Sequence, residues 1–233
     1  MKKVSFACIL FIVASFQLEA KKNPKPNVIV IFTYDHRYTG IHALGGQAVK
    51  TPQLDDLAEN GLAFTNTYLM GSFSGATCIP SRAMLHTGRN LFQLDGIGYD
   101  LPANQTTIGE AFMHAGYHAH FVGKWHQDFN SLARSFNSGG KIVGKPLYLT
   151  DQFRMPFSDW QVEGNYNTEN CYLMQYDDMG KVLHRPLTED DKRGPTGTEK
   201  NGPHVSEVLA DEAANFIQEY DKKQPFFMYL AFP

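Results

Sequence analysis

Short apolar runs alternate with helix-like patterns along most of this chain of 233 residues. Residues 27–32 form a continuous apolar run rich in Val and Ile, which predicts a buried parallel strand. Residues 51–61 begin with Thr-Pro, carry an apolar stripe and end at Gly, so they predict a short helix. The same patterns predict further helices and strands at 107–114, 118–122, 205–220 and 226–232. Repeated alternation of strand and helix predicts an α/β sheet fold.

A long irregular stretch interrupts this alternation between Gln127 and Pro203, where Gly, Pro, Asn and Thr become frequent. One hairpin is expected within it, with strands at 172–175 and 181–183 joined by a turn-like segment at 177–180. Long irregular inserts in compact domains often carry function. We therefore slightly favour an insert that shapes a substrate pocket over a plain surface loop.

The first 20 residues have the pattern of a signal peptide. Lys2 and Lys3 precede an apolar run that ends at Phe16, and Ala20 supplies a small residue before polar sequence resumes. The apolar run is shorter than the about 20 residues that span a bilayer, so it predicts export to the periplasm or the medium with no membrane anchor.

The remaining residues, 21–233, are numerous enough to enclose one substantial core and are interpreted as one domain. The formal net charge of the whole chain is −3, and the sequence contains no basic stripe. A nucleic-acid partner is therefore not expected.

Two cysteines follow the leader, Cys78 and Cys171. An exported protein with so few cysteines is no disulfide scaffold, and the two thiols could be paired, both free, or used for different purposes. A small buried residue is the simplest interpretation of Cys171, whereas the neighbours of Cys78 suggest chemistry.

The candidate chemistry is concentrated in residues 78–89, with the sequence CIPSRAMLHTGR. Pro80 suits the first turn of a helix, so Cys78 should lie at the helix entrance beside unpaired N–H groups and the positive end of the dipole. That position favours anions. Arg82 follows one turn later on the same face, where its guanidinium can reach an anion or an ionised nucleophile. Taken singly, a buried Cys and a surface Arg on an ordinary amphipathic helix are the simpler interpretation.

The segment closely resembles the signature of the sulfatase family, C-x-P-S-R followed by L-x-T-G-R. The matching residues are Cys78, Pro80, Ser81, Arg82, Leu85, Thr87, Gly88 and Arg89. The resemblance extends to the first strand, the helix at 51–61 and the segment 123–126, and so covers most of the chain after the leader. It implies an alkaline-phosphatase-like fold, a three-layer α/β sandwich with a mostly parallel central sheet, of which this chain would be the N-terminal part.

The resemblance also implies an activity, the hydrolysis of sulfate esters. In that family a maturing enzyme reads the signature and oxidises the cysteine to formylglycine. One hydroxyl of the hydrated aldehyde attacks sulfur, and the second allows the carbonyl to re-form as sulfate leaves. Cys78 is therefore the expected precursor of the nucleophile, and the expected partners are a sulfate ester and a formylglycine-generating enzyme.

Lys124 and His126 are the other candidate catalytic residues. They stand two apart at the end of a strand-like run, so alternation should point both side chains to one side, at the strand end where open α/β sheets bind ligands. By resemblance, Lys124 would bind sulfate oxygens or the formylglycine hydroxyl, and His126 would transfer protons or hold the nucleophile. Each residue alone would more simply be a solvated surface residue.

The expected metal site is where the sequence departs from the family. Family members usually carry two adjacent aspartates after the first strand, as oxygen ligands for calcium or sometimes magnesium. Here the pair is Tyr34-Asp35. Asp35 remains an expected ligand, together with formylglycine derived from Cys78. Tyr34, a neutral phenol with a pKa of about 10, would weaken a divalent-cation site.

The family's later histidine, second acidic pair and further lysine would lie beyond Pro233. A chain that ends as a strand finishes is expected to be a truncated form, inactive and poorly stable as it stands.

The sequence leaves three functions open. The leading hypothesis is a sulfate ester hydrolase that acts outside the cytoplasm on sulfated sugars. A phosphate or phosphonate ester hydrolase of the same superfamily would use the same pocket for another tetrahedral anion. A non-catalytic protein could retain the anion pocket after losing the metal through Tyr34. Assays with sulfate and phosphate aryl esters, together with the metal content, separate the three.

Overall fold

The computed structural model describes residues 24–34, 36–73, 77–96, 98–143, 153, 155–192 and 201–233. The expected signal peptide at 1–20 lies outside these ranges. Within them, no helix is both long enough and apolar enough to cross a membrane.

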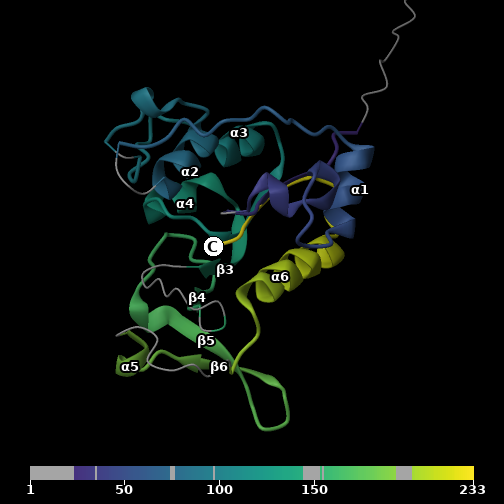
Figure 1. Cartoon of the computed structure of the whole chain (residues 1–233). Coiled ribbons are helices and arrows are strands. Elements are labelled where there is room, and N and C mark those ends of the chain that lie inside the picture. Colours follow the sequence, from purple (N-terminus) through teal and green to yellow (C-terminus); the bar gives the residue numbers. More distant parts are fainter. Residues whose placement is uncertain are drawn as a thin grey trace, which may run out of the picture.

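One mixed sheet organises this part of the chain, with its seven strands in the order β1-β7-β2-β3-β4-β5-β6. Figure 1 labels β3, β4, β5 and β6 of this sheet. The strands that pair in parallel are β1 (Val28–Phe32), β7 (Phe226–Ala231), β2 (His118–Lys124) and β3 (Ser138–Val143). Phe32 lies opposite Ala231, which in turn lies opposite Gly123. The carboxyl ends of three parallel strands therefore meet at one edge of the sheet, which confirms the predicted α/β architecture.

The irregular insert supplies an antiparallel extension of this sheet. It contains β4 (Phe157–Ser158), β5 (Cys171–Tyr176) and β6 (Val182–Pro186), which pair antiparallel in that order beyond β3. The hairpin predicted within the insert is confirmed, with somewhat longer strands. The sequence did not predict that β4 would join this hairpin to the parallel half of the sheet.

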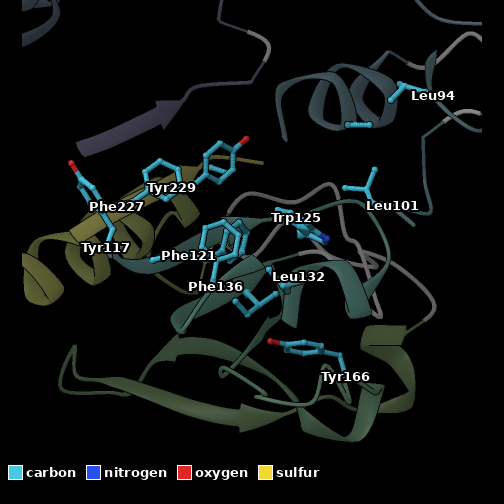
Figure 2. Packing of buried hydrophobic residues seen from close by; sticks show 14 of the residues in the cluster. Leu94, Leu101, Tyr117, Phe121, Trp125, Leu132, Phe136, Tyr166, Phe227 and Tyr229 are labelled. Atoms are coloured by element: carbon cyan, nitrogen blue, oxygen red, sulfur yellow. The ribbon is translucent and has the colours of Figure 1, made fainter. Parts of the chain in front are cut away.

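Helices cover the two faces of the parallel half. One face packs on α2 (Cys78–Thr87), α3 (Ile108–His114) and α4 (Phe129–Ser135), and Figure 2 shows Trp125 and Phe121 within this cluster. The opposite face packs on α6 (Val205–Glu219) through Val208, Leu209 and Ala213. Two further helices, α1 (Pro52–Asn60) and α5 (Glu189–Lys192), complete the α-helices of the described ranges. Figure 1 shows α2, α3 and α4 grouped together, apart from α6.

Local signals explain where these helices begin and end. Thr107 accepts a hydrogen bond from the Glu110 backbone N–H, and the Glu110 carboxylate accepts one from the Thr107 N–H, so a capping box starts α3. Gly88, with φ of 65°, ends α2 in the left-handed conformation that favours glycine. The predicted helices at 107–114 and 205–220 and the strands at 118–122 and 226–232 are confirmed to within about two residues.

One expectation about burial is wrong, and one predicted apolar stripe is exposed. The strand predicted as buried at 27–32 forms and is parallel, but β1 is an edge strand whose Ile29 and Ile31 are 43% and 53% exposed. Helix α1 also forms, yet none of its residues is buried and Leu57 of the expected apolar stripe is 63% exposed. Apolar periodicity marks the face that can be buried and does not determine which part of the chain covers it.

The core also contains a histidine that cannot easily be charged. His86 of α2 is 1% exposed and packs against the rings of Trp125 and Tyr229, at centroid distances of 4.1 Å and 4.7 Å. Neither ring nitrogen has a hydrogen-bond partner in the described residues. Burial, and to a smaller extent the nearby charge of Arg82, lowers the pKa of His86 to about 3.

Stability should therefore fall as the pH is lowered from about 6.5 to about 3. Above this window His86 is neutral in both states, whereas within it only the unfolded chain takes up a proton, which favours unfolding by up to about 1.4 kcal/mol per pH unit. Urea unfolding between about pH 7.5 and pH 4 should give a shallower pH slope for His86→Phe, which keeps the ring packing. His184→Phe, at an exposed position, should keep the original slope. An identical slope in wild type and His86→Phe would contradict this assignment.

Candidate active site

The signature segment forms the first turn of α2, at the carboxyl edge of the parallel strands. Cys78 is the first residue of the helix, is partly exposed and follows Thr77, which makes no side-chain cap. Pro80 lies in the first turn and is buried. The prediction that Cys78 stands at a helix entrance is therefore confirmed, with the backbone N–H groups of that turn directed at its surroundings.

Arg82 is fully buried one turn further along α2. Its Nη1 donates to the Lys124 carbonyl oxygen at 2.7 Å, and its Nη2 donates to the Phe232 carbonyl oxygen at 3.0 Å. The guanidinium carbon also lies 4.8 Å from the centre of the Phe32 ring and 5.4 Å from that of Tyr34. Arg82 thus joins α2 to the ends of β1, β2 and β7, a role that the sequence did not predict. Its predicted contact with an anion or a nucleophile stays a prediction.

Lys124 brings a second buried cation to the same edge. It is 3% exposed, and its Nζ lies 4.3 Å from the centre of the Tyr34 ring. Cations over aromatic rings are attracted to the negative face of the ring. Two cations and one aromatic ring are therefore assembled where the resemblance expects an anion and a metal ion.

Backbone strain accompanies this arrangement. Tyr34 and His126 have φ of 46° and 76°, which non-glycine residues seldom adopt and which cluster at functional sites. Gly123 has φ of 101° at a register shift in β2, and a Cβ there would collide with the Ala231 carbonyl oxygen. Only glycine allows β2 and β7 to approach this closely just before Lys124.

A hydrogen bond joins the segment after β2 to the first turn of α2. The Gln127 side chain is fully buried, and its Nε2 donates to the Ile79 carbonyl oxygen at 2.8 Å. Trp125 is also buried and donates its indole N–H to the Asp128 carbonyl oxygen at 2.9 Å. The structure thus brings the signature turn and residues 124–127 together.

Strand alternation cannot orient His126 as predicted, because β2 ends at Lys124 and His126 has a positive φ.

The sequence patterns did not reveal Gln127. Its position directly after the segment 123–126 was the available signal, but a lone glutamine in an irregular stretch does not indicate a contact with a helix turn distant in sequence. The role of Phe32 as a ring beneath the Arg82 guanidinium was missed for the same reason.

The described residues do not assemble a divalent-metal site of the expected kind. Among them, no group of three or more His, Cys, Asp or Glu side chains is placed to hold a metal ion. Asp35 itself lies outside the described residues. At the adjoining position, the Tyr34 ring contacts a cation, an arrangement unlike a hard oxygen site for Ca²⁺. The metal-ligand roles of Asp35 and of formylglycine from Cys78 therefore stay predictions.

The second cysteine belongs to the core and not to this site. Cys78 and Cys171 are not bonded to each other. Cys171 is buried in β5, with its sulfur 3.2 Å from Ser158 Oγ, and burial raises the pKa of its thiol. Of the alternatives open from the sequence, the structure shows both thiols free, and a separate use for Cys78 stays a prediction.

Comparison with known proteins identifies the family to which this chain belongs. The family model described as Sulfatase matches residues 26–233. N-acetylglucosamine-6-O-sulfatase of Bacteroides thetaiotaomicron is 26% identical over 231 residues, which cover 94% of this chain and 33% of that protein. Arylsulfatase G of Homo sapiens is 28% identical over an alignment that covers 98% of this chain and 45% of that protein. This chain thus spans less than half of the length of either relative.

A solved structure agrees with these matches. The sulfatase from Pseudoalteromonas sp. is similar in fold, with a TM-score of 0.56 at 26% identity, over 92% of this chain and 45% of that chain. The partial coverage of the longer chain accords with the shares found for the two relatives.

Replacing Arg82 by lysine should destabilise the protein although the charge is kept. A lysine ammonium cannot reproduce the planar fork that reaches two carbonyl oxygens at once, so we expect a loss of about 3 kcal/mol in the free energy of unfolding. Urea denaturation followed by circular dichroism measures this loss. Arg89→Lys, at an exposed position of the same signature, should change it by less than about 0.5 kcal/mol. Equal effects of the two substitutions would show that the contacts of Arg82 contribute little.

Proposed function

Because this chain belongs to the sulfatase family, we propose that the protein hydrolyses sulfate esters at the carboxyl edge of its parallel strands, with Cys78 as the precursor of a formylglycine nucleophile. The observation that carries the proposal is the joining of the signature turn of α2 to residues 124–127 through Arg82 and Gln127. This joining puts a nucleophile position, a buried lysine and a histidine on segments held in direct contact.

Each residue of the proposed site has its own task. Formylglycine, once made from Cys78 and hydrated by one water molecule, would supply two hydroxyl groups on one carbon. The N–H groups of the first turn of α2 favour the sulfate group beside Cys78. The Lys124 ammonium supplies positive charge for the sulfate oxygens, and its burial strengthens this attraction. His126 exchanges a proton with the reacting hydroxyl or the leaving oxygen. Arg82 fixes the position of Lys124 through the carbonyl oxygen of that residue.

A sulfated sugar is the substrate class we propose. The similar protein from Bacteroides thetaiotaomicron is named N-acetylglucosamine-6-O-sulfatase, which supports this class. Lys124 lies opposite Val143 on the neighbouring strand. Val143 lies opposite Phe157, and Phe157 lies opposite Tyr172 of the insert. The insert therefore lies beside the proposed site, where it could contact the sugar. We further propose that the leader directs export, so that a maturing enzyme modifies Cys78 on the way out.

A non-catalytic anion-binding protein is the second candidate, and Tyr34 is the observation that favours it. The Tyr34 ring contacts Lys124, whereas the resemblance expects a carboxylate ligand at this position. Such a protein would bind sulfate without turning over its esters. A phosphate or phosphonate ester hydrolase would instead turn over the corresponding phosphate esters.

Maturation and turnover test the proposal together. The protein is produced at the full length of its gene together with a formylglycine-generating enzyme, and mass spectrometry of the peptide that contains residue 78 should show an aldehyde in place of the thiol. Turnover of an aryl sulfate should fall by about 10³-fold or more in Cys78→Ala, because the nucleophile is lost. Cys171→Ala removes a thiol outside the proposed site and should keep the activity of the parent protein.

Each remaining outcome selects a different function. Faster turnover of an aryl phosphate than of the sulfate would support the phosphatase alternative. Sulfate binding in calorimetry with an unmodified Cys78 and no turnover of either ester would replace the catalytic proposal by the anion-binding one.

Restoring a carboxylate at position 34 should create affinity for calcium. Tyr34→Asp replaces a neutral ring by a hard oxygen ligand next to Asp35, so we expect Ca²⁺ to bind at least about tenfold more tightly than to the wild type. Isothermal titration calorimetry measures the difference. Tyr34→Phe keeps the ring over Lys124 and should stay at the wild-type affinity. Equal calcium affinities in Tyr34→Asp and Tyr34→Phe would exclude position 34 as a metal-ligand position.

A further inference from the structure

A second group of side chains with ligand chemistry lies at the opposite end of β2. A cavity of about 330 Å³ is lined by His118, His120 and Ser138 from the strands and by residues at the end of α6, including Phe216. His118 begins β2 and Ser138 begins β3, whereas Lys124 ends β2. At a rise of about 3.3 Å per residue, His120 and Lys124 are separated by about 13 Å. The cavity is therefore distinct from the proposed active site.

Two imidazole nitrogens converge on one point in this cavity. His118 Nε2 and His120 Nδ1 each lie 2.8 Å from Ser138 Oγ. The two histidines are two apart on one strand and so share a face of the sheet, and Ser138 lies opposite His120 on β3. Because both nitrogens approach the same oxygen, they are at most twice that distance apart. Paired imidazoles on one strand that point at a common position are a typical start of a metal site.

Aromatic packing holds the two rings in this orientation. The Phe216 ring stacks on His120 at a centroid distance of 3.8 Å and an angle of 7°. It also lies nearly parallel to His118, at 6.2 Å and 15°, and Tyr220 is 5.7 Å from His118. Helix α6 therefore fixes both imidazoles before any ligand arrives, which lowers the entropic cost of binding one.

Burial favours the neutral form of both rings. Burial lowers the pKa of His120 to about 3, with His118 as a smaller cause, and burial with nearby Lys222 lowers the pKa of His118. Neutral imidazole is the form that coordinates a metal, so protons compete little at pH 7. A single Ser138 hydroxyl can donate to only one of the two nitrogens, so one ring must donate to it.

The present hydrogen bonds also leave a polar atom unsatisfied. His120 is 5% exposed, and its Nε2 atom is buried without a hydrogen-bond partner in the described ranges. A buried polar atom without a partner is uncommon and is more easily tolerated where the side chain serves a function.

We propose that His118 and His120 bind a divalent transition-metal ion such as Zn²⁺, Ni²⁺ or Cu²⁺, with the Ser138 oxygen and water completing its coordination. Nitrogen ligands favour these ions over Ca²⁺ and Mg²⁺, which prefer oxygen. Small ring movements suffice, because metal–nitrogen bonds of about 2.0–2.1 Å replace the hydrogen bonds to Ser138. The ring that donates to Ser138 moves its proton to its other nitrogen. Glu219 and Asp221 also line the cavity and offset the charge of Lys222.

The test is a titration of the chain, without a polyhistidine tag, with ZnCl₂ and NiCl₂ at neutral pH. Calorimetry should show one ion per chain, and His118→Gln and His120→Gln should each weaken binding by at least about tenfold. His118 is only partly buried, so its variant is expected to fold even if substitution of His120 unfolds the protein. Circular dichroism reports the folding of each variant. His114→Gln, at an exposed histidine in the last turn of α3, is the matched control and should bind as the wild type does.

Further measurements separate this site from the proposed active site. Cys78→Ala should keep the affinity for Zn²⁺, and millimolar Ca²⁺ should not displace the ion. Electron paramagnetic resonance of the Cu²⁺ complex should show two imidazole nitrogens in the wild type and one in His118→Gln. The absence of binding by the wild type, an undiminished affinity in His118→Gln, or a loss of binding in Cys78→Ala would each overturn the proposal. None of these results depends on sulfatase turnover.

Discussion

The position of the signature helix depends on one buried guanidinium. Arg82 cannot be deprotonated at any relevant pH, so its burial requires hydrogen-bond acceptors that stabilise the charge. The carboxyl end of a parallel sheet offers suitable acceptors. Beyond the last residue pair of the sheet, backbone carbonyl groups are not used for hydrogen bonds between strands. Lys124 ends β2 and Phe232 follows β7, and both give their carbonyl oxygens to Arg82. The charge is thus stabilised by the same edge that it holds together.

This interaction explains why residues far apart in the sequence share one site. Arg82 lies 42 positions from Lys124 and 150 positions from Phe232. Any movement of α2 along the strand ends would break both hydrogen bonds and leave the guanidinium in the core without these acceptors. Cys78, one turn earlier in the same helix, is therefore held at a fixed height above the edge. Gln127 adds a second contact at the start of the helix and prevents rotation about Arg82.

Local features of this fold could be predicted from the sequence, whereas its long-range contacts could not. The capping box at Thr107 and the helix end at Gly88 follow from residues within one turn of each other. The burial of Arg82 depends on carbonyl groups whose position only the assembled sheet determines. Strand alternation does not extend from Lys124 to His126, because β2 ends at Lys124 and His126 has a positive φ. The edge position of β1 could not be predicted either, because an apolar run does not indicate whether a strand has one neighbouring strand or two.

The two ends of β2 illustrate how one physical effect produces opposite chemistry. Burial acts on Arg82 and Lys124 at the carboxyl end and on His120 near the other end. The guanidinium of Arg82 keeps its charge, because its intrinsic pKa is far above neutrality and carbonyl oxygens solvate it, and the edge becomes favourable for anions. The imidazole of His120 starts near neutrality and loses its proton on burial, so its nitrogens become available to cations. The identity of the side chain, and not the depth of burial, therefore decides which sign of ligand each end of the strand can accept.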